Sequence, residues 1–388
     1  MRKYLVIGIL AVLLAVAALT FAQTEPVKKS WTYLVFMNGD NDLDSYGQLN
    51  LNQMAKGMKS DENVNVIVLY DHFGAPAELL QVKSSGVVKL ADYGEPDMGD
   101  NETLRQFLSW GVTEYPADHY VVVLWDHGGG WKTLSVDFTS NSRMSIEGLR
   151  QAMASVTTQT GKKFDITVFD ACLMSMIEVG DQLKNVTDYT VSSEAAIDAG
   201  GFPYDLLIKR LVDNPNQTPA EYSRGMVDDF YSAYQKSKAT ASAIDESKIG
   251  PIVTAVDNLS LTLIANMKAY SSSIGSARSV AQHMVYGSNG VFWFIDLRVF
   301  VDQLANSIPN GTIAAQTAAV KTAMGNAVYE RHTKQLEGKQ YGLSINFPPN
   351  KVKYDDKSYL AQNYQGVDLL FPNETNWDEM LLLYYTKK

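Results

Sequence analysis

The chain has 388 residues, of which 46% are hydrophobic and 20% are charged, so it can bury a sizeable core. Its formal net charge of −10 excludes the broad basic face that nucleic-acid binding needs and suits basic substrates or bound cations. Its only cysteine is Cys172, so an internal disulfide is excluded.

The amino-terminal residues 1–22 have the layout of a secretory signal peptide. Two basic residues, Arg2 and Lys3, precede an uncharged apolar run that ends at Phe21, and Ala22 is a suitable cleavage point. The run is also about as long as the shortest membrane-spanning helices, so an uncleaved anchor is the alternative. We therefore expect a secreted or periplasmic protein that meets a membrane only if the leader is retained.

Strands and helices are expected to alternate after a flexible lead-in over residues 23–30. One helix is capped by Asp100 or Asn101 and another by Ser145. Because apolar strands alternate with helices, we expect an α/β fold with a mainly parallel sheet flanked by helices. The expected strands are Thr32–Met37, Val64–Tyr70, His119–Trp125, Asp165–Phe169 and Tyr189–Ser192.

The alternating elements define a catalytic core over residues 31–215. Beyond it, residues 216–388 are more helical and are expected to pack on the core. A late strand, Gly342–Phe347, is expected to return to the sheet.

Two of the apolar strands lead directly into reactive residues. His119–Trp125 is followed by Asp126, His127 and three glycines, and Asp165–Phe169 is followed by Asp170, Ala171 and Cys172. Ligands bind at the carboxyl ends of parallel strands, so His127 and Cys172 should meet there if the two strands are neighbours.

This pair of residues predicts nucleophilic catalysis. A thiol becomes a strong nucleophile when a nearby imidazole removes its proton, so we assign Cys172 as nucleophile and His127 as base. The backbone N–H groups of Gly128 and Cys172 are the candidates for an oxyanion hole, since glycine allows a close backbone approach.

The sequence disfavours two other classes of enzyme, a serine hydrolase and a zinc enzyme. A glycine-rich run after histidine also occurs in esterases, but the chain has no Gly-x-Ser-x-Gly nucleophile motif. The five histidines show no paired helical spacing of the kind that binds zinc. The remaining alternative is a catalytically silent peptide-binding protein on a peptidase scaffold.

The residues around His127 and Cys172 resemble those of the clostripain family, within the caspase-like clan of cysteine peptidases. The resemblance implies a caspase-like sheet, a Cys–His dyad, cleavage after Arg or Lys, and self-cleavage. It also implies calcium dependence in some members, although no cofactor is required for the chemistry itself. The segments that carry the resemblance are Tyr33–Asp44, Met98–Trp110, Val121–Trp131, Phe169–Glu178, Gly201–Asp205, Tyr341–Pro348 and Asn376–Asp378.

The resemblance also implies an acidic pocket for the basic side chain of the substrate. Asp170 matches the family's acidic residue two positions before the nucleophile, and a carboxylate there would bind arginine through charge-assisted hydrogen bonds. Asp198 and Asp205 are further candidates for this pocket. The alternative is that Asp170 only accepts hydrogen bonds from loop backbone.

Two further segments carry expectations. Asn38–Asp44 is rich in side-chain oxygens, and we interpret it as a helix-capping turn beside the active site, with calcium binding as the alternative. Residues 132–143 are polar and are expected to form an exposed loop. Within this loop, Arg143 is the favoured site of self-cleavage and Lys132 the less accessible one.

Overall fold

A computed structural model describes residues 26–236, 239–281, 294–334, 339–350, 364 and 367–386. The expected leader over residues 1–22 lies outside the described residues, as does part of the lead-in over residues 23–30.

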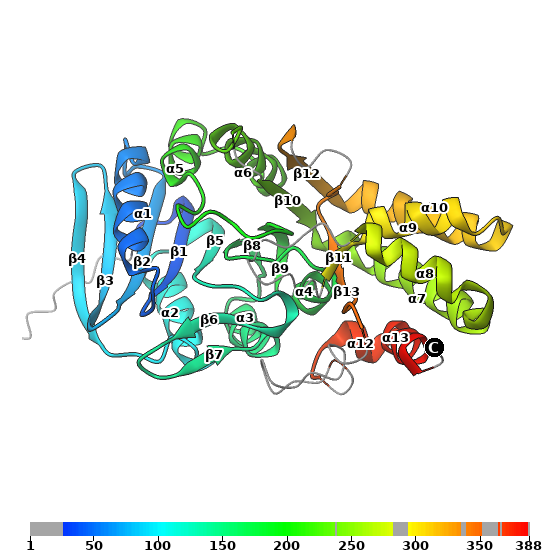
Figure 1. The fold of residues 1–388 in the computed structure, drawn as a ribbon. Helices are drawn as coiled ribbons and strands as arrows, with labels where there is room; N and C mark the ends of the chain where they lie inside the picture. Colours follow the sequence, from blue (N-terminus) through cyan, green and yellow to red (C-terminus); the bar gives the residue numbers. More distant parts are fainter. Residues whose placement is uncertain are drawn as a thin grey trace, which may run out of the picture.

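The fold is built on a nine-stranded mixed sheet with the order β12-β10-β9-β8-β5-β1-β2-β3-β4 (Figure 1). The five central strands, from β9 to β2, run parallel, and an antiparallel pair extends the sheet at each edge. The caspase-like α/β fold is confirmed, although the antiparallel edges were not predicted. The strands are β1 (Lys29–Gly39), β2 (Val64–His72), β3 (Ala75–Lys83), β4 (Gly86–Gly94), β5 (Ala117–Trp125), β8 (Phe164–Asp170), β9 (Thr187–Ser192), β10 (Thr240–Asp245) and β12 (Val328–His332).

Helices cover both faces of this sheet because its central strands are apolar on both sides. Along β1, for example, Leu34 and Phe36 pack in one core, and Tyr33 and Val35 pack in the other. Figure 1 shows one layer of helices above the sheet and another below it. The first layer is α1 (Asp44–Gly57), α5 (Tyr204–Asp213) and α6 (Pro219–Ala233), and the second is α2 (Asn101–Glu114), α3 (Ile146–Thr160) and α4 (Ile177–Leu183).

Both expected helix caps form. The side chain of Asp100 accepts a hydrogen bond from the backbone N–H of Glu102 at the start of α2. The side chain of Ser145 accepts one from Gly148 at the start of α3. Each cap satisfies a backbone donor that the first helical turn cannot pair.

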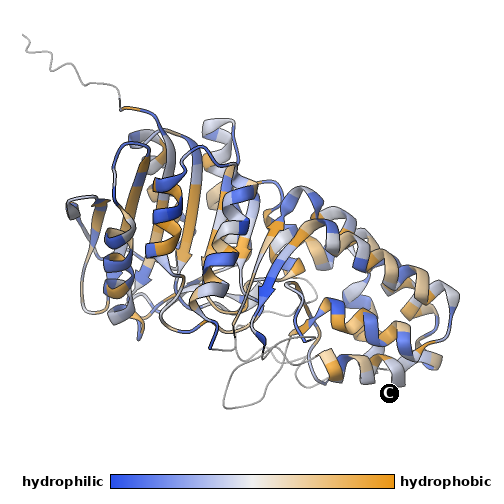
Figure 2. Ribbon diagram, turned by 90° about the horizontal axis from the view of Figure 1, so that it is seen from above, coloured by the Kyte–Doolittle hydropathy of each residue, from blue (hydrophilic) through white to orange (hydrophobic). Residues whose placement is uncertain are grey.

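The carboxy-terminal half adds a helical region at one end of the sheet. Its helices pack mainly on one another and on α4 (Figure 1). Apolar residues are concentrated on the central strands and on parts of the helices beside them (Figure 2). The helices are α7 (Ile249–Ala265), α8 (Met267–Ala281), α9 (Leu297–Ser307), α10 (Gly311–Ala327), α12 (Leu370–Glu374) and α13 (Trp377–Thr386).

The main sheet extends beyond residue 215 through β10 and β12, whereas Gly342–Phe347 does not return to it. Within this segment, β13 (Ser344–Asn346) pairs with β11 (Phe294–Asp296) in a separate two-stranded sheet. The prediction was wrong because β12 already pairs with the outer side of β10.

Among the described residues, the helical stretch Glu246–Ala265 is long and apolar enough to cross a membrane by composition alone. Its side chains at Ile252, Val256 and Leu259 are fully buried in the protein core. Core packing therefore accounts for its apolar character.

Candidate active site

The register of two neighbouring strands brings His127 and Cys172 together. Strands β5 and β8 are parallel and adjacent, and their last partners are Trp125 and Asp170. His127 and Cys172 each lie two residues beyond these partners. Both line a cleft of about 130 Å³ at the carboxyl edge of the sheet, with Asp170 and a segment after β9. The two residues therefore line the same cleft, at the edge of the sheet where they were expected.

The Cys172 thiol lies half-buried against the segment that follows β9. The backbone N–H of Ile197 donates a hydrogen bond to Sγ at 3.3 Å. The next residue, Leu173, has a left-handed backbone (φ 67°) and donates to the carbonyl of Ala195 at 3.1 Å. Burial raises the pKa of the Cys172 thiol, and the Ile197 N–H opposes this shift. The thiol is therefore neutral at rest and needs a base.

His127 is held by a carboxylate that was not among the predicted site residues. Its Nε2 lies 2.8 Å from Oδ1 of Asp42, and this hydrogen bond lowers the pKa of Asp42. In the described part of the chain, the other ring nitrogen of His127, Nδ1, makes no hydrogen bond to Cys172 or to any other residue. Asp42 comes shortly after β1, which pairs with β5. Functional residues gather at the carboxyl ends of parallel strands, so the position of Asp42 after a predicted strand was a signal for it in the sequence.

A buried network beneath His127 fixes the turn that carries Asp42. Oδ1 of Asp126 accepts a hydrogen bond from Asn41 Nδ2 at 2.8 Å, and Oδ2 accepts one from Asn38 Nδ2 at 3.0 Å. The side chain of Asn41 also accepts from the backbone of Leu43. The side chain at the N-cap of α1, Leu43, makes no capping hydrogen bond, so the expected helix-capping role of this turn is wrong. The turn instead stabilises the end of β5 through the hydrogen bonds from Asn38 and Asn41 to Asp126.

Gly128 allows the backbones of the two reactive strands to approach closely. A β-carbon at Gly128 would overlap the carbonyl of Cys172 and lie 3.0 Å from its nitrogen. Within the described residues, neither the Gly128 nor the Cys172 N–H donates to another protein atom. Both groups are thus free to serve the predicted oxyanion hole.

Asp170 lines the cleft but is also bound by its surroundings. Its Oδ2 accepts hydrogen bonds from the Tyr204 hydroxyl at 2.8 Å and the Phe202 N–H at 3.1 Å. Gly201, with φ 67°, passes so close that a β-carbon would lie 2.5 Å from this oxygen. Burial raises the pKa of Asp170 to about 6. Asp170 thus accepts a hydrogen bond from loop backbone and also lines the cleft.

The other two acidic candidates differ in position. Asp198 is exposed and lines the cleft. Asp205 lies in the first turn of α5, outside the residues that line the cleft, and its carboxylate pairs with Lys56 at 2.6 Å. Of these two, only Asp198 is placed to meet a substrate.

The segment after His127 is not an open loop along its length, which corrects that expectation. It forms a small hairpin of β6 (Leu134–Asp137) and β7 (Ser142–Met144) after the short helix η1 (Gly130–Lys132). Lys132 is buried beside the ring of Trp131, whereas Arg143 is exposed on β7. The apolar residues at both ends of the hairpin, Leu134 and Met144, hold it to the core.

Comparisons with known proteins agree with this geometry. Residues 35–384 match the model of the clostripain family. Clostripain from Hathewaya histolytica is 24% identical over 219 residues, a match that covers 46% of this chain and 42% of clostripain. The chain thus spans less than half the length of that curated relative.

Two solved structures share the fold. An inactive protease zymogen from Parabacteroides distasonis superposes with a TM-score of 0.67 at 28% identity, covering 83% of this chain and 93% of that one. A secreted cysteine protease from Bacteroides thetaiotaomicron, bound to an irreversible peptide inhibitor, has a TM-score of 0.67 at 21% identity. That match covers 91% of this chain and 99% of the other.

Proposed function

Because the chain belongs to the clostripain family, we propose that it is a cysteine endopeptidase in which Cys172 is the nucleophile and His127 the base. The observation that carries the proposal is the β5–β8 register, which places both side chains in one cleft. The parallel ladder fixes the two strand ends, and each reactive residue lies only two residues beyond its strand's last paired position.

The proposed reaction follows from the positions of these groups. His127 accepts the thiol proton as Sγ of Cys172 attacks the substrate carbonyl, and the N–H groups of Gly128 and Cys172 stabilise the resulting oxyanion. His127 then gives the proton to the leaving amine, which produces an acyl-enzyme. Water, deprotonated by the same imidazole, releases the acid product and restores the thiol.

We further propose that the enzyme cleaves after Arg or Lys. Asp170 lies at the carboxyl end of β8, two residues before the nucleophile, and lines the cleft. Its Oδ2 is engaged by Tyr204 and Phe202, which would hold the carboxylate in one orientation for a cationic side chain. Asp198 adds a second negative charge to the same cleft.

Export and self-processing complete the proposal. We propose that the leader is removed near Gln23, which mass spectrometry of the native protein would detect. An intact Met1–Ala22 segment in membrane fractions would instead support the anchor.

Self-cleavage is proposed after Arg143, because this residue is exposed whereas Lys132 is buried. The related protein from Parabacteroides distasonis is described as a zymogen.

The proposed dyad is tested by comparing purified Cys172→Ala, His127→Ala and His119→Ala variants. The first two should each lose peptide hydrolysis by several orders of magnitude, roughly a million-fold in comparable triads, and the double variant should be little worse. His119 pairs with Asp165 away from the cleft, so His119→Ala is a matched control that should stay active. Substantial turnover by Cys172→Ala would overturn the assignment.

The runner-up function, a silent peptide-binding protein on the same scaffold, has a separate test. A peptide carrying a thiol-reactive group should label Cys172 in the wild type and should not label the His127→Ala variant at a comparable rate. If neither labelling nor hydrolysis occurs while an unreactive Arg peptide still binds, the silent protein is the better description.

A further inference from the structure

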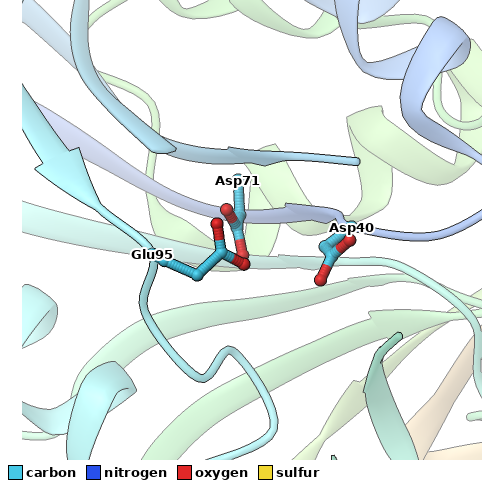
Figure 3. A group of neighbouring side chains, drawn as sticks. All are labelled: Asp40, Asp71 and Glu95. Carbon is cyan, nitrogen blue, oxygen red and sulfur yellow. The ribbon is translucent and has the colours of Figure 1, made fainter. Parts of the chain in front are cut away.

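Three carboxylates from different parts of the chain converge beside the turn that carries Asp42. Asp40 follows β1, Asp71 lies near the end of β2, and Glu95 follows β4. One oxygen of each lies within 4.8 Å of an oxygen of the other two. Figure 3 shows the carboxyl groups of Asp71 and Glu95 pointing toward each other, with that of Asp40 beside them.

Asp71 occupies a position where an apolar residue would be expected. It continues the row formed by Ile67 and Leu69, which face the protein core. Its side chain is fully buried, yet neither of its oxygens has a hydrogen-bond partner among the described residues. Oδ1 of Asp40 is likewise buried without a partner. A buried carboxylate without a partner is costly, so such groups usually pair or coordinate a metal.

The electrostatic surroundings make the cluster more unfavourable still. Burial raises the pKa of Asp71 to about 8, with further contributions from Glu95, Asp137 and Asp40. Burial also raises the pKa of Asp137, on β6, and the nearby Asp40 adds to this shift. Among the ion pairs of the described residues, none includes any of these four acids. The cluster thus concentrates negative charge with no protein cation beside it.

We propose that Asp40, Asp71 and Glu95 bind a divalent cation of the calcium type. The donors are all carboxylate oxygens, which hard cations prefer, and two ligands of one ion with bonds of about 2.4 Å can lie up to about 4.8 Å apart. Calcium suits an irregular donor set better than magnesium, which demands near-octahedral geometry. Only Asp40 belongs to the oxygen-rich turn Asn38–Asp44, so this site differs from a calcium loop formed by that turn alone.

Such an ion would brace the active-site side of the sheet. The carbonyl of Asp40 accepts a hydrogen bond from Phe138 at 2.9 Å, and its Oδ2 accepts one from Thr139 at 2.8 Å, both in the turn between β6 and β7. Asp40 lies two residues before Asp42, which holds His127. A cation at this cluster therefore joins the turn after β1, the end of β2 and the β6–β7 hairpin.

The inference is tested by binding and stability, without using activity. The full-length Cys172→Ala variant, stripped of metal with a chelator, is titrated with Ca²⁺ or Mg²⁺ by calorimetry and then unfolded thermally. We expect one Ca²⁺ site and a rise in Tm of roughly 5 °C at about 100 times Kd, with weaker Mg²⁺ binding. Adding Asp71→Asn should abolish the calcium response and raise the Tm of the metal-free protein, because it removes a buried carboxyl group that has no hydrogen-bond partner among the described residues.

A matched control is Glu62→Gln, which removes one negative charge at an exposed position. It should keep the full calcium response. The proposal is overturned if the metal-free protein binds no Ca²⁺, or if Asp71→Asn retains the same stoichiometry and Tm shift. Because the nucleophile is absent from every protein compared, these outcomes are independent of whether the chain is a peptidase.

Discussion

At the scale of single residues, Asp42 distinguishes this cleft from a simple pair of reactive side chains. Its carboxylate holds Nε2 of His127, which fixes the ring and favours the imidazolium that forms during attack. The Asp42 side chain is 70% exposed, so solvent screens this interaction. Asp42 is therefore a positioning residue whose effect should be moderate.

We expect Asp42→Asn to lower kcat roughly tenfold with little change in KM, because a screened charge contributes far less than the base itself. Steady-state kinetics on one Arg peptide would measure both constants. Asp188→Asn, which removes an exposed carboxylate on β9, should leave both constants unchanged. An equal loss in Asp42→Asn and His127→Ala would contradict a positioning role.

The second residue-scale prediction concerns Asp170 and pH. A carboxylate attracts a basic substrate only when ionised, and burial raises the pKa of Asp170 to about 6. The ratio of kcat/KM for an Arg peptide over a neutral peptide should therefore fall as pH is lowered through about 6, since kcat/KM reports the free enzyme. The Asp170→Asn variant should show a small ratio that does not vary with pH.

Asp198→Asn is the matched comparison, because its carboxylate lines the same cleft but is exposed. It should reduce the Arg preference only slightly and preserve the pH dependence of the ratio. A large, pH-dependent preference in Asp170→Asn would assign recognition of the basic side chain to another group.

At the scale of elements, the β6–β7 hairpin decides where self-cleavage can occur. A two-stranded ribbon is only marginally stable alone, and Arg143 is the exposed residue of its second strand. The purified wild type should therefore be cut after Arg143 into two chains that the sheet holds together, with a new amino terminus at Met144. Amino-terminal sequencing after prolonged incubation measures this cut.

The variants make the assignment specific. Arg143→Gln and Cys172→Ala should both remain as one chain, while Lys132→Gln should be cut as the wild type is. A wild-type protein that stays uncut with full activity would show that no cleavage step is needed.

At the scale of the whole molecule, several buried carboxyl groups make stability depend on pH. Burial raises the pKa of Glu178 to about 7, of Glu246 to about 8 and of Asp296 to about 7. In the unfolded chain such groups ionise near pH 4. Between these values the folded state binds more protons, so its stability is greatest at low pH and is lost as pH rises through the folded pKa values.

The Tm of the chelator-treated Cys172→Ala variant should therefore fall between pH 5.5 and pH 8. Glu246→Gln should make this fall shallower, because it removes one of the titrating groups, whereas exposed Glu62→Gln should not. Calorimetric scans in buffers of equal ionic strength would measure both. A Tm that rises over this interval would contradict the claim that these buried carboxyl groups lower stability as pH increases.

The sequence by itself determined the central parallel strands, two helix caps and the reactive pair. Apolar runs such as the one before His127 specify buried parallel strands, because only strands covered on both faces need apolar side chains throughout. The caps at Asp100 and Ser145 are local interactions within one helical turn, so they too could be predicted. His127 and Cys172 followed from a rule about strand ends that needs no coordinates.

Tertiary structure decided everything that depends on which segments become neighbours. Asp42 meets His127 only because β1 pairs with β5, and Ile197 reaches Cys172 only because β9 pairs with β8. The convergence of Asp71 with Asp40 and Glu95 likewise joins residues that are separated along the chain by the helix α1 and by the strands β3 and β4. Local propensity acts within a few residues, whereas these contacts are fixed by strand order, which is set by the packing of the whole chain.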